Sequence, residues 1–407
     1  MADRLHVATH KGLFELARGH GIWEVANVQF LGDPVSAVLA DVDGAVYAAL
    51  DLGHFGAKLW RRDPAGDWQE LAPPAFPPKP PDADGDPHPW SLGKIWVIEP
   101  GGVAGRLWAG TMPGGLFRSD DGGESWSLNE ALWHMPERRQ WSGVAGGEQP
   151  GIDSLLIDPR NPGDIRIGVS TGGVWASTDG GISWRNINRG MYAEYMPPEQ
   201  REQPIAQDVH RLARCAAYPE IVWCQHHNGV FRSEDAGATW HELTAIRPSK
   251  FGFAVAAHPH DPDTAWFVPP VKDERRIPVD GKVVVARTRD GGRSFEVLRK
   301  GLPQNHAYDL VWRHALAVDA SGEHLAFGPT SGGLWISEDG GDAWSMSEAR
   351  LPRSLQCALP LAEREPLPAR LFPPEGHDQH VAIGRQSRID RRYRGYAVID
   401  PAVVDQR

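Results

Sequence analysis

One short motif, Ser/Thr-x-Asp-x-Gly-x-Ser/Thr-Trp, recurs five times in this chain and constrains its fold more than any other feature; one copy has Phe295 in place of the tryptophan and another has Ala343 in place of the second hydroxyl. The copies are RSDDGGESW at 118–126, STDGGISW at 177–184, SEDAGATW at 233–240, TRDGGRSF at 288–295 and SEDGGDAW at 337–344. Their aspartates are Asp121, Asp179, Asp235, Asp290 and Asp339, at intervals of 49 to 58 residues. A period of this size indicates one supersecondary unit copied along the chain.

The content of each repeat predicts four β-strands. A glycine and alternating apolar residues precede each motif, as in GGLFR at 114–118, which is typical of a half-buried strand. The motif itself supplies a turn, because Asp and Gly tolerate left-handed dihedrals. Further upstream, IDSLLIDPRNPGDIRIGVS at 152–170 has a turn signal between two strands. Four strands per repeat is the size of a propeller blade.

The number of repeats predicts an all-β fold, a seven-bladed β-propeller with four-stranded blades. Two degenerate copies, GLFELARGHGIW at 12–23 and LWRRDPAGDW at 59–68, precede the clear ones. The aromatic residues that close the seven copies are Trp23, Trp68, Trp126, Trp184, Trp240, Phe295 and Trp344.

The two ends of this repeat region predict a closed ring. The first copy has no room for an innermost strand before RLHVATHKGLFEL, whereas LPRSLQCALPLA at 351–362 is strand-like and has no outer strands after it. We expect this segment to be the innermost strand of the first blade, which removes the open sheet edges. The domain prediction is a propeller over 1–362 and a C-terminal extension over 363–407 packed on it.

The repeated motif resembles the Asp box of the BNR propellers, whose best-known members are the sialidases. The resemblance covers residues 1–362 and implies that the motif is structural, joining the third and fourth strands of a blade away from the central pocket. It implies no single activity, because Asp boxes also occur in xyloglucan-degrading endoglucanases, sortilin-type receptors and a photosystem II assembly propeller. The Arg-Ile-Pro signature of sialidases is absent from the first blade, and Arg276-Ile277-Pro278 lies in a sixth-blade insertion.

Composition narrows the classes of partner. A net charge of −11 argues against a general nucleic-acid binder or a protein that docks on anionic membranes. No apolar run is long enough to span a bilayer, and no secretion leader is visible, so a cytoplasmic location is expected. Of the three cysteines, Cys215 and Cys224 could be neighbours across one hairpin, but both are expected to be reduced core thiols; no cofactor is expected. The oligomeric state is not predicted.

The candidate site lies on the face where the chain enters the innermost strands and where second strands connect to third strands. Long insertions at 73–90, 128–151 and 186–208 fall on this face, which indicates a pocket or a recognition surface. In the fifth blade, Asp208 and His210 enter the innermost strand, while His226 and His227 end the strand beside it. Antiparallel pairing therefore brings these four side chains to one rim.

Three interpretations of this cluster stay open: acid–base or substrate-binding chemistry, a divalent metal site, or histidines that only bond loop carbonyls. The catalytic candidates are Glu194, Asp208 and His210, and the weak metal candidates are His210 and His226. The ligand-binding candidates are Trp90, Tyr192, Tyr195, His226, His227 and His306.

Two functions follow from these residues. The favoured one is a cytoplasmic scaffold that binds a protein or a small molecule, such as a carbohydrate, through its channel face. The alternative is a glycoside hydrolase with its pocket at the channel mouth, which requires two carboxyl groups across a cleft. Asp51, Asp153, Glu194 and Asp208 are the residues from which such a pair would come.

Overall fold

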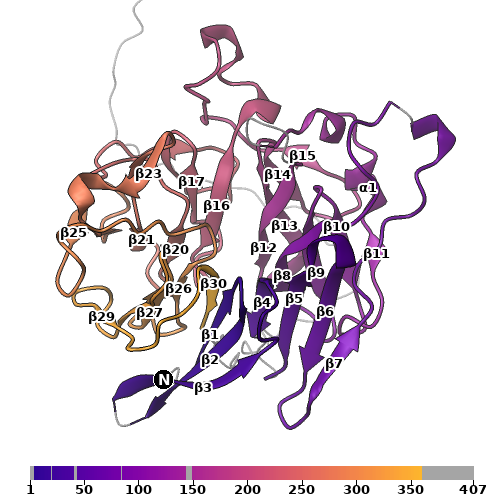
Figure 1. Ribbon diagram of the computed structural model, residues 1–407. Coiled ribbons are helices and arrows are strands. Elements are labelled where there is room, and N and C mark those ends of the chain that lie inside the picture. The colour runs from indigo at the N-terminus through magenta and orange to yellow at the C-terminus, as the bar shows by residue number, and fades with distance from the viewer. Residues whose placement is uncertain (1–3, 20, 41–43, 84, 144–148, 360–407) are drawn as a thin grey trace, which may run out of the picture. The chain divides into compact units, whose positions relative to one another are not determined.

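The computed structural model describes residues 4–359 except 20, 41–43, 84 and 144–148. Within them, the chain forms seven four-stranded antiparallel sheets and one additional hairpin, as predicted (Figure 1). The proposed extension at 363–407 lies outside the described residues. No helix within the described ranges is long and apolar enough to cross a membrane.

The first four blades, each given from its innermost strand outward, are the following. Blade one is β30 (Ser354–Ala358), β1 (Arg4–Thr9), β2 (Gly12–Gly19) and β3 (Ile22–Gln29); blade two is β4 (Val35–Ala40), β5 (Val46–Asp51), β6 (Ala57–Arg62) and β7 (Trp68–Leu71); blade three is β8 (Lys94–Pro100), β9 (Leu107–Met112), β10 (Leu116–Ser119) and β11 (Ser127–Leu128); blade four is β12 (Gly151–Asp158), β13 (Asn161–Ser170), β14 (Gly173–Ser177) and β15 (Arg185–Asn186).

The remaining blades follow the same order. Blade five is β16 (Val209–Arg214), β17 (Val222–His226), β18 (Gly229–Ser233) and β19 (His241–Glu242); blade six is β20 (Val255–Ala257), β21 (Ala265–Phe267), β24 (Val285–Thr288) and β25 (Glu296–Leu298), with the hairpin β22 (Pro270–Lys272) and β23 (Arg275–Pro278) inserted between its second and third strands; blade seven is β26 (Leu316–Val318), β27 (Leu325–Phe327), β28 (Trp335–Ser337) and β29 (Ser345–Met346).

Short helices occur only in the connections of the described chain. They are α1 (Glu130–Trp133) and the 3-10 turns η1 (Gly53–Phe55), η2 (Pro81–Ala83), η3 (Arg138–Gln140), η4 (Pro198–Gln200), η5 (Pro204–Ala206) and η6 (Val279–Gly281). Five of them, η2, α1, η3, η4 and η5, lie within the three long insertions noted above, so the insertions contain local structure of their own.

The innermost strands form a hub. Going round, β30, β4, β8, β12, β16, β20 and β26 each pack against the next, and β26 packs against β30. Large apolar side chains fill the space between blades; Trp108, Trp223 and Trp266 are almost completely buried there. The blades thus pack against one another around one axis, with buried apolar side chains between them.

The ring closes through β30, as predicted from residues 351–362. β30 pairs antiparallel with β1, from His6 opposite Ala358 to Thr9 opposite Ser354, and Figure 1 shows the two strands side by side. The side chain of Gln356 bonds both backbone groups of Val38 in blade two, at 2.9 Å each. On the other side, the Cys357 amide donates to the His314 carbonyl that precedes β26, at 3.0 Å. One strand therefore joins three blades.

The Asp boxes are turn structures, in agreement with the prediction. In blade four, Asp179 accepts bonds from the Ser177 hydroxyl at 2.7 Å, the Ser183 amide at 2.9 Å and the Ser183 hydroxyl at 2.6 Å. The same set of acceptor bonds occurs at the other four boxes, except that Ala343 supplies only its amide. Each box joins the third strand to the fourth, at the strand ends opposite the second-to-third connections.

Replacing Asp179 by Ala is expected to lower the melting temperature by a few degrees and to leave ligand affinity unchanged. The substitution removes three acceptor bonds that fix the turn but touches nothing on the opposite face. Ser183→Ala, which removes one of these bonds, should have a smaller effect. Differential scanning calorimetry measures both; an affinity change at unchanged stability would contradict the structural role of the box.

Candidate functional site

The ends of the innermost strands surround a cavity of about 670 Å³, which we call the hub cavity. Its volume lies in the range of small-molecule sites, roughly 300–1,000 Å³. Every blade contributes to it, through the residue stretches entering innermost strands and the second-to-third connections. The lining residues are His10, Pro34, Ser36, Asp51, Lys94, Trp96, Met112, Gln149, Ser170, Asp208, His210, His227, Phe253, Asp273, Arg276, Trp312, Arg313, His314, Arg353 and Leu355.

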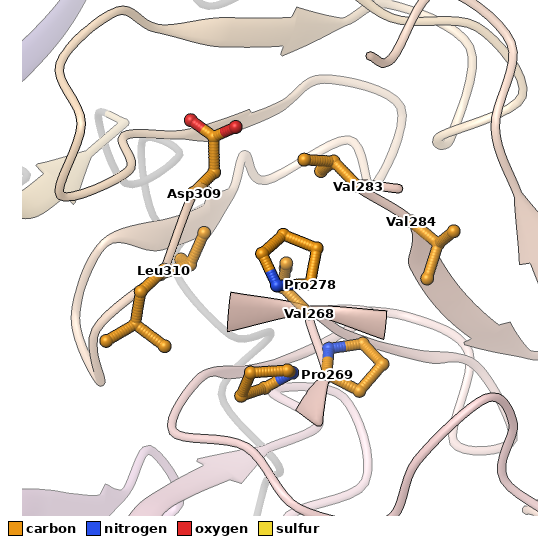
Figure 2. A pocket seen from close by; sticks show the side chains of 9 residues that line it. Val268, Pro269, Pro278, Val283, Val284, Asp309 and Leu310 are labelled. Atoms are coloured by element: carbon orange, nitrogen blue, oxygen red, sulfur yellow. The ribbon is translucent and has the colours of Figure 1, made fainter. Parts of the chain in front are cut away.

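A second cavity lies beside blade six and is not a ligand site. Figure 2 shows Pro269, Pro278, Val283 and neighbouring side chains around it, with Asp309 at one side. Its volume is about 10 Å³, and a single water needs roughly 10–15 Å³. The hub cavity is therefore the candidate site.

Asp208, His210 and His227 form a cluster at the wall of the hub cavity, as the strand pairing predicts. Asp208 immediately precedes β16 and His227 immediately follows β17, so the His227 amide donates to the Asp208 carbonyl at 2.9 Å. The Asp208 Oδ2 atom lies 3.1 Å from His227 Nδ1 and 3.4 Å from His210 Nε2. We refer to these three residues as the Asp208 cluster.

Neighbouring charges, hydrogen bonds and burial shift the pKa values of Asp208 and His210. Burial alone would raise the pKa of the Asp208 carboxyl, but the charge and hydrogen bond of His210, the hydrogen bond of His227 and the charge of Arg313 hold that pKa well below its usual range. Burial lowers the pKa of the His210 imidazole. The Asp208 carboxylate acts in the opposite direction, because it favours the charged ring, but its effect is smaller than that of burial. We take Asp208 as ionised, because His227 and Arg313 support that state independently of His210.

Aromatic rings and cations form the rest of the wall. The Arg313 guanidinium lies 5.2 Å from the Trp96 ring and 5.7 Å from the Phe253 ring. Arg276 and Arg353 lie 5.8 and 5.7 Å from the ring of Trp312, which is in contact with Phe253 at 4.5 Å. Stacked cations of this kind combine flat apolar surfaces with hydrogen-bond donors.

These wall residues were missed in the sequence. Their shared position could have revealed them, because each is an aromatic residue at the start of an innermost strand. Trp96 is the third residue of β8, and Phe253 and Trp312 shortly precede β20 and β26. The predicted entrances were placed too early instead: β8 begins at Lys94 rather than near Trp90, and β26 begins at Leu316 rather than near His306.

Asp153 lies just behind this wall and does not line the cavity. Its carboxylate pairs with Arg313 Nε at 3.0 Å and accepts from the Ser154 hydroxyl at 2.6 Å. Burial raises the pKa of Asp153 to about 7, in spite of the opposing charge of Arg313. The second guanidinium branch of Arg313 donates to the Ser170 hydroxyl at 3.0 Å, so the pair is anchored in blade four.

Of the two adjacent histidines, the structure brings His227 to the cavity and places His226 in the blade. His226 is fully buried, its ring lies 5.4 Å from Phe231, and its Nδ1 atom accepts from the Asn228 amide. Burial lowers the pKa of His226 to about 3, so the ring is neutral.

The side chains predicted from MYAEYM lie beside the hub cavity rather than in its lining. Glu194 pairs with Lys250 at 3.0 Å. Tyr192 donates to Glu242, and burial together with this carboxylate raises the pKa of Tyr192 to about 12. The Tyr195 ring lies 5.0 Å from the His227 ring, and the Tyr195 hydroxyl donates to the Ala206 carbonyl, close to Asp208.

Trp90 and His306 also lie outside the cavity lining. The Trp90 indole donates to Asp86 at 3.0 Å, and Asp86 forms a buried ion pair with Arg138 of η3. Trp90 therefore helps to hold the 73–90 and 128–151 insertions together. His306 is an exposed loop residue with a φ of 52°.

Comparisons with known proteins agree with this architecture. Residues 117–128 match the BNR/Asp-box repeat family. By sequence, the chain is similar to a probable oligoxyloglucan-reducing end-specific xyloglucanase of Neosartorya fischeri, with 25% identity over 59% of this chain and 30% of that protein. It is similar to a Paenibacillus xyloglucanase, with 22% identity over 57% of this chain and 23% of that protein. The chain thus spans less than a third of the length of these relatives.

Two solved structures have related folds. An ancestral GH74 enzyme matches with a TM-score of 0.50 and 17% identity, over 74% of this chain and 36% of that one. YCF48 from Cyanidioschyzon merolae matches with a TM-score of 0.51 and 14% identity, over 79% of this chain and 87% of that one. Together with the five boxes and the closed ring of blades, these matches identify the chain as a seven-bladed β-propeller that carries BNR/Asp-box repeats.

Proposed function

We propose that the protein is a propeller of the glycoside hydrolase type, acting on a carbohydrate bound in the hub cavity. The observation that carries this proposal is that aromatic rings, cations and the ionised Asp208 all face one cavity of sugar-binding size. This reverses the order of the two functions drawn from the sequence, in which the scaffold was favoured. The similarity to xyloglucanases supports the reversal.

The wall suits a sugar ring. Flat aromatic faces such as Trp96 and Trp312 pack against the apolar face of a pyranose, and a few charged or polar groups fix its orientation. Arg353 pairs with no carboxylate among the described residues, so its guanidinium is available to a ligand hydroxyl or carboxylate.

Hydrolysis of a glycosidic bond uses two carboxyl groups, one ionised and one that donates a proton. Asp208 fits the ionised role. Three further carboxyl groups are near: Asp153 is sealed behind Arg313, and Asp273 is held by Arg276 at 3.0 Å. Asp51 lines the cavity, pairs with no cation within the described chain, and accepts only from the Gly53 amide, at 3.3 Å. We therefore propose Asp51 as the second carboxyl group of the pair.

The test is turnover of xyloglucan oligosaccharides and of chromogenic β-glycosides, measured as reducing ends or released chromophore. Asp208→Asn and Asp51→Asn are each expected to lower kcat by about 10²–10⁴, the size of an acid–base contribution. Calorimetric affinity for the oligosaccharide should change little. Glu194→Gln is the matched control, because Glu194 does not line the cavity.

Oligosaccharide binding without turnover in the wild-type protein would refute the hydrolase and support the binding scaffold. Equal loss of activity in Glu194→Gln and Asp208→Asn would contradict the assignment of the site to the hub cavity.

A further inference from the structure

We propose that the Asp208 cluster is a divalent transition-metal site, bound by Asp208 Oδ2, His210 Nε2 and His227 Nδ1. One candidate ligand atom from each residue lies within 4.8 Å of the others. The inference concerns the same wall as the proposed hydrolase and shares Asp208 with it, but it depends only on the geometry of these three side chains.

The tautomer of His210 is the first argument. Its Nδ1 atom lies 2.6 Å from the Gly252 carbonyl oxygen, which can only accept, so Nδ1 carries the proton. In the neutral ring Nε2 then carries a lone pair, and it lies 3.4 Å from the carboxylate oxygen Asp208 Oδ2. Two electron-rich atoms this close are stabilised by a cation between them, and a divalent metal ion is such a cation.

The spacing of the ligand atoms is the second argument. Zinc–nitrogen and zinc–oxygen bonds of about 2.0–2.1 Å at a tetrahedral angle separate neighbouring ligand atoms by roughly 3.3–3.4 Å. Asp208 Oδ2 lies 3.4 Å from His210 Nε2 and 3.1 Å from His227 Nδ1. The three atoms thus stand close to where zinc would hold them.

The support around the ligands is the third argument. A ligating histidine usually donates its other nitrogen to a carbonyl or carboxylate, as His210 does to Gly252. The His210 ring stacks on Phe253 at 4.5 Å, and the His227 ring lies 5.5 Å from Phe251, edge-on. Asp208 Oδ1 is buried and has no hydrogen-bond partner among the described residues. The cluster is therefore prearranged, with one carboxylate oxygen still unsatisfied.

The donor set selects the metal class. Two imidazoles and one carboxylate suit zinc and other first-row divalent ions rather than magnesium or calcium, which favour all-oxygen sites. Three protein ligands leave a coordination position toward the hub cavity, as in catalytic rather than structural sites. All three residues line that cavity, so a bound ion would meet the ligand. The neighbouring cation, Arg313, is paired with Asp153 at 3.0 Å.

The experiment is metal binding by the full chain. Protein treated with a chelator and then dialysed is titrated with zinc alone, by calorimetry and by thermal shift, and metal content is measured by mass spectrometry. We expect one equivalent of zinc and a melting temperature that rises with zinc concentration. Asp208→Asn and His227→Gln should each weaken zinc affinity by at least about tenfold, since even supporting residues contribute about 10–100-fold.

His10→Gln is the matched control, because His10 is a histidine of the same cavity outside the cluster. His227 is partly exposed, so His227→Gln is expected to fold, which circular dichroism verifies. Absence of a stoichiometric site, or equal zinc affinity in His227→Gln and wild type, would overturn the proposal. Zinc binding without glycoside turnover would support the metal site and refute the proposed hydrolase. Glycoside turnover that the chelator does not change, in a protein that binds no zinc, would support the hydrolase and refute the metal site.

Discussion

A chain that stops after Arg350 is expected to be insoluble when expressed, whereas a chain that stops after Arg364 folds like the full protein. The shorter chain lacks β30, so β1 loses its hydrogen-bonded partner and becomes an open edge. Blade one also loses Cys357 and Leu359 from the core it shares with blade seven. Exposed strand edges pair with other chains, and a domain is stable by only about 5–15 kcal/mol.

Soluble yield, circular dichroism and thermal unfolding of the two truncated chains measure this effect. A peptide of residues 351–362 added in trans should rescue part of the shorter chain, since it supplies the missing strand. A soluble, cooperatively melting chain ending at Arg350 would show that the ring does not need β30.

Replacing Arg313 by Met is the second change with a large expected effect. It leaves the Asp153 carboxylate buried without its cation, and breaking such a pair costs about 3–5 kcal/mol of folding free energy. The loss should depend on pH. The folded pKa of Asp153 is about 7, above its usual value, so the folded protein holds a proton that the unfolded chain releases. Removing Arg313 raises this pKa further.

The direction of the pH effect follows from this difference in bound protons between the folded and the unfolded chain. In the wild type, the contribution of Asp153 to stability falls as pH rises from about 4 to about 7, because the unfolded chain binds fewer protons there. The Arg313→Met penalty should therefore be larger near about pH 8 than near about pH 5, where the carboxyl is neutral. Urea unfolding at the two pH values measures it. Asp153→Asn/Arg313→Met should recover part of the loss, and an equal penalty at both pH values would contradict the role of a buried charge.

The fold could be predicted because local and global signals in the repeats agree. The motif around Asp179 specifies its own turn through bonds within seven residues, so each copy can be recognised alone. Ring closure was also predictable, since an unpaired strand-like segment at one end matched a missing strand at the other.

The candidate site was harder, because its residues come from all seven blades and their orientation depends on strand register. His226 and His227 are the same residue type, yet His226 ends β17 and is buried in the blade, whereas His227 follows the strand and lines the cavity. The starts of β8 and β26 were placed four and ten residues too early, which hid Trp96 and Trp312. Trp90 was predicted to bind a ligand because it lies in an irregular loop. Its indole instead donates a hydrogen bond to Asp86, which forms a buried ion pair with Arg138.

The position of β30 has a consequence for synthesis on the ribosome. Strand β1 emerges first, and the strand that covers its inner edge emerges about 345 residues later, after roughly 20–70 s at ordinary translation rates of about 5–20 residues per second. During that interval the nascent chain carries six completed or forming blades and one unsealed edge. Chaperone occupancy on the nascent polypeptide should therefore persist until residue 358 has cleared the exit tunnel, long after most of the blades have been made.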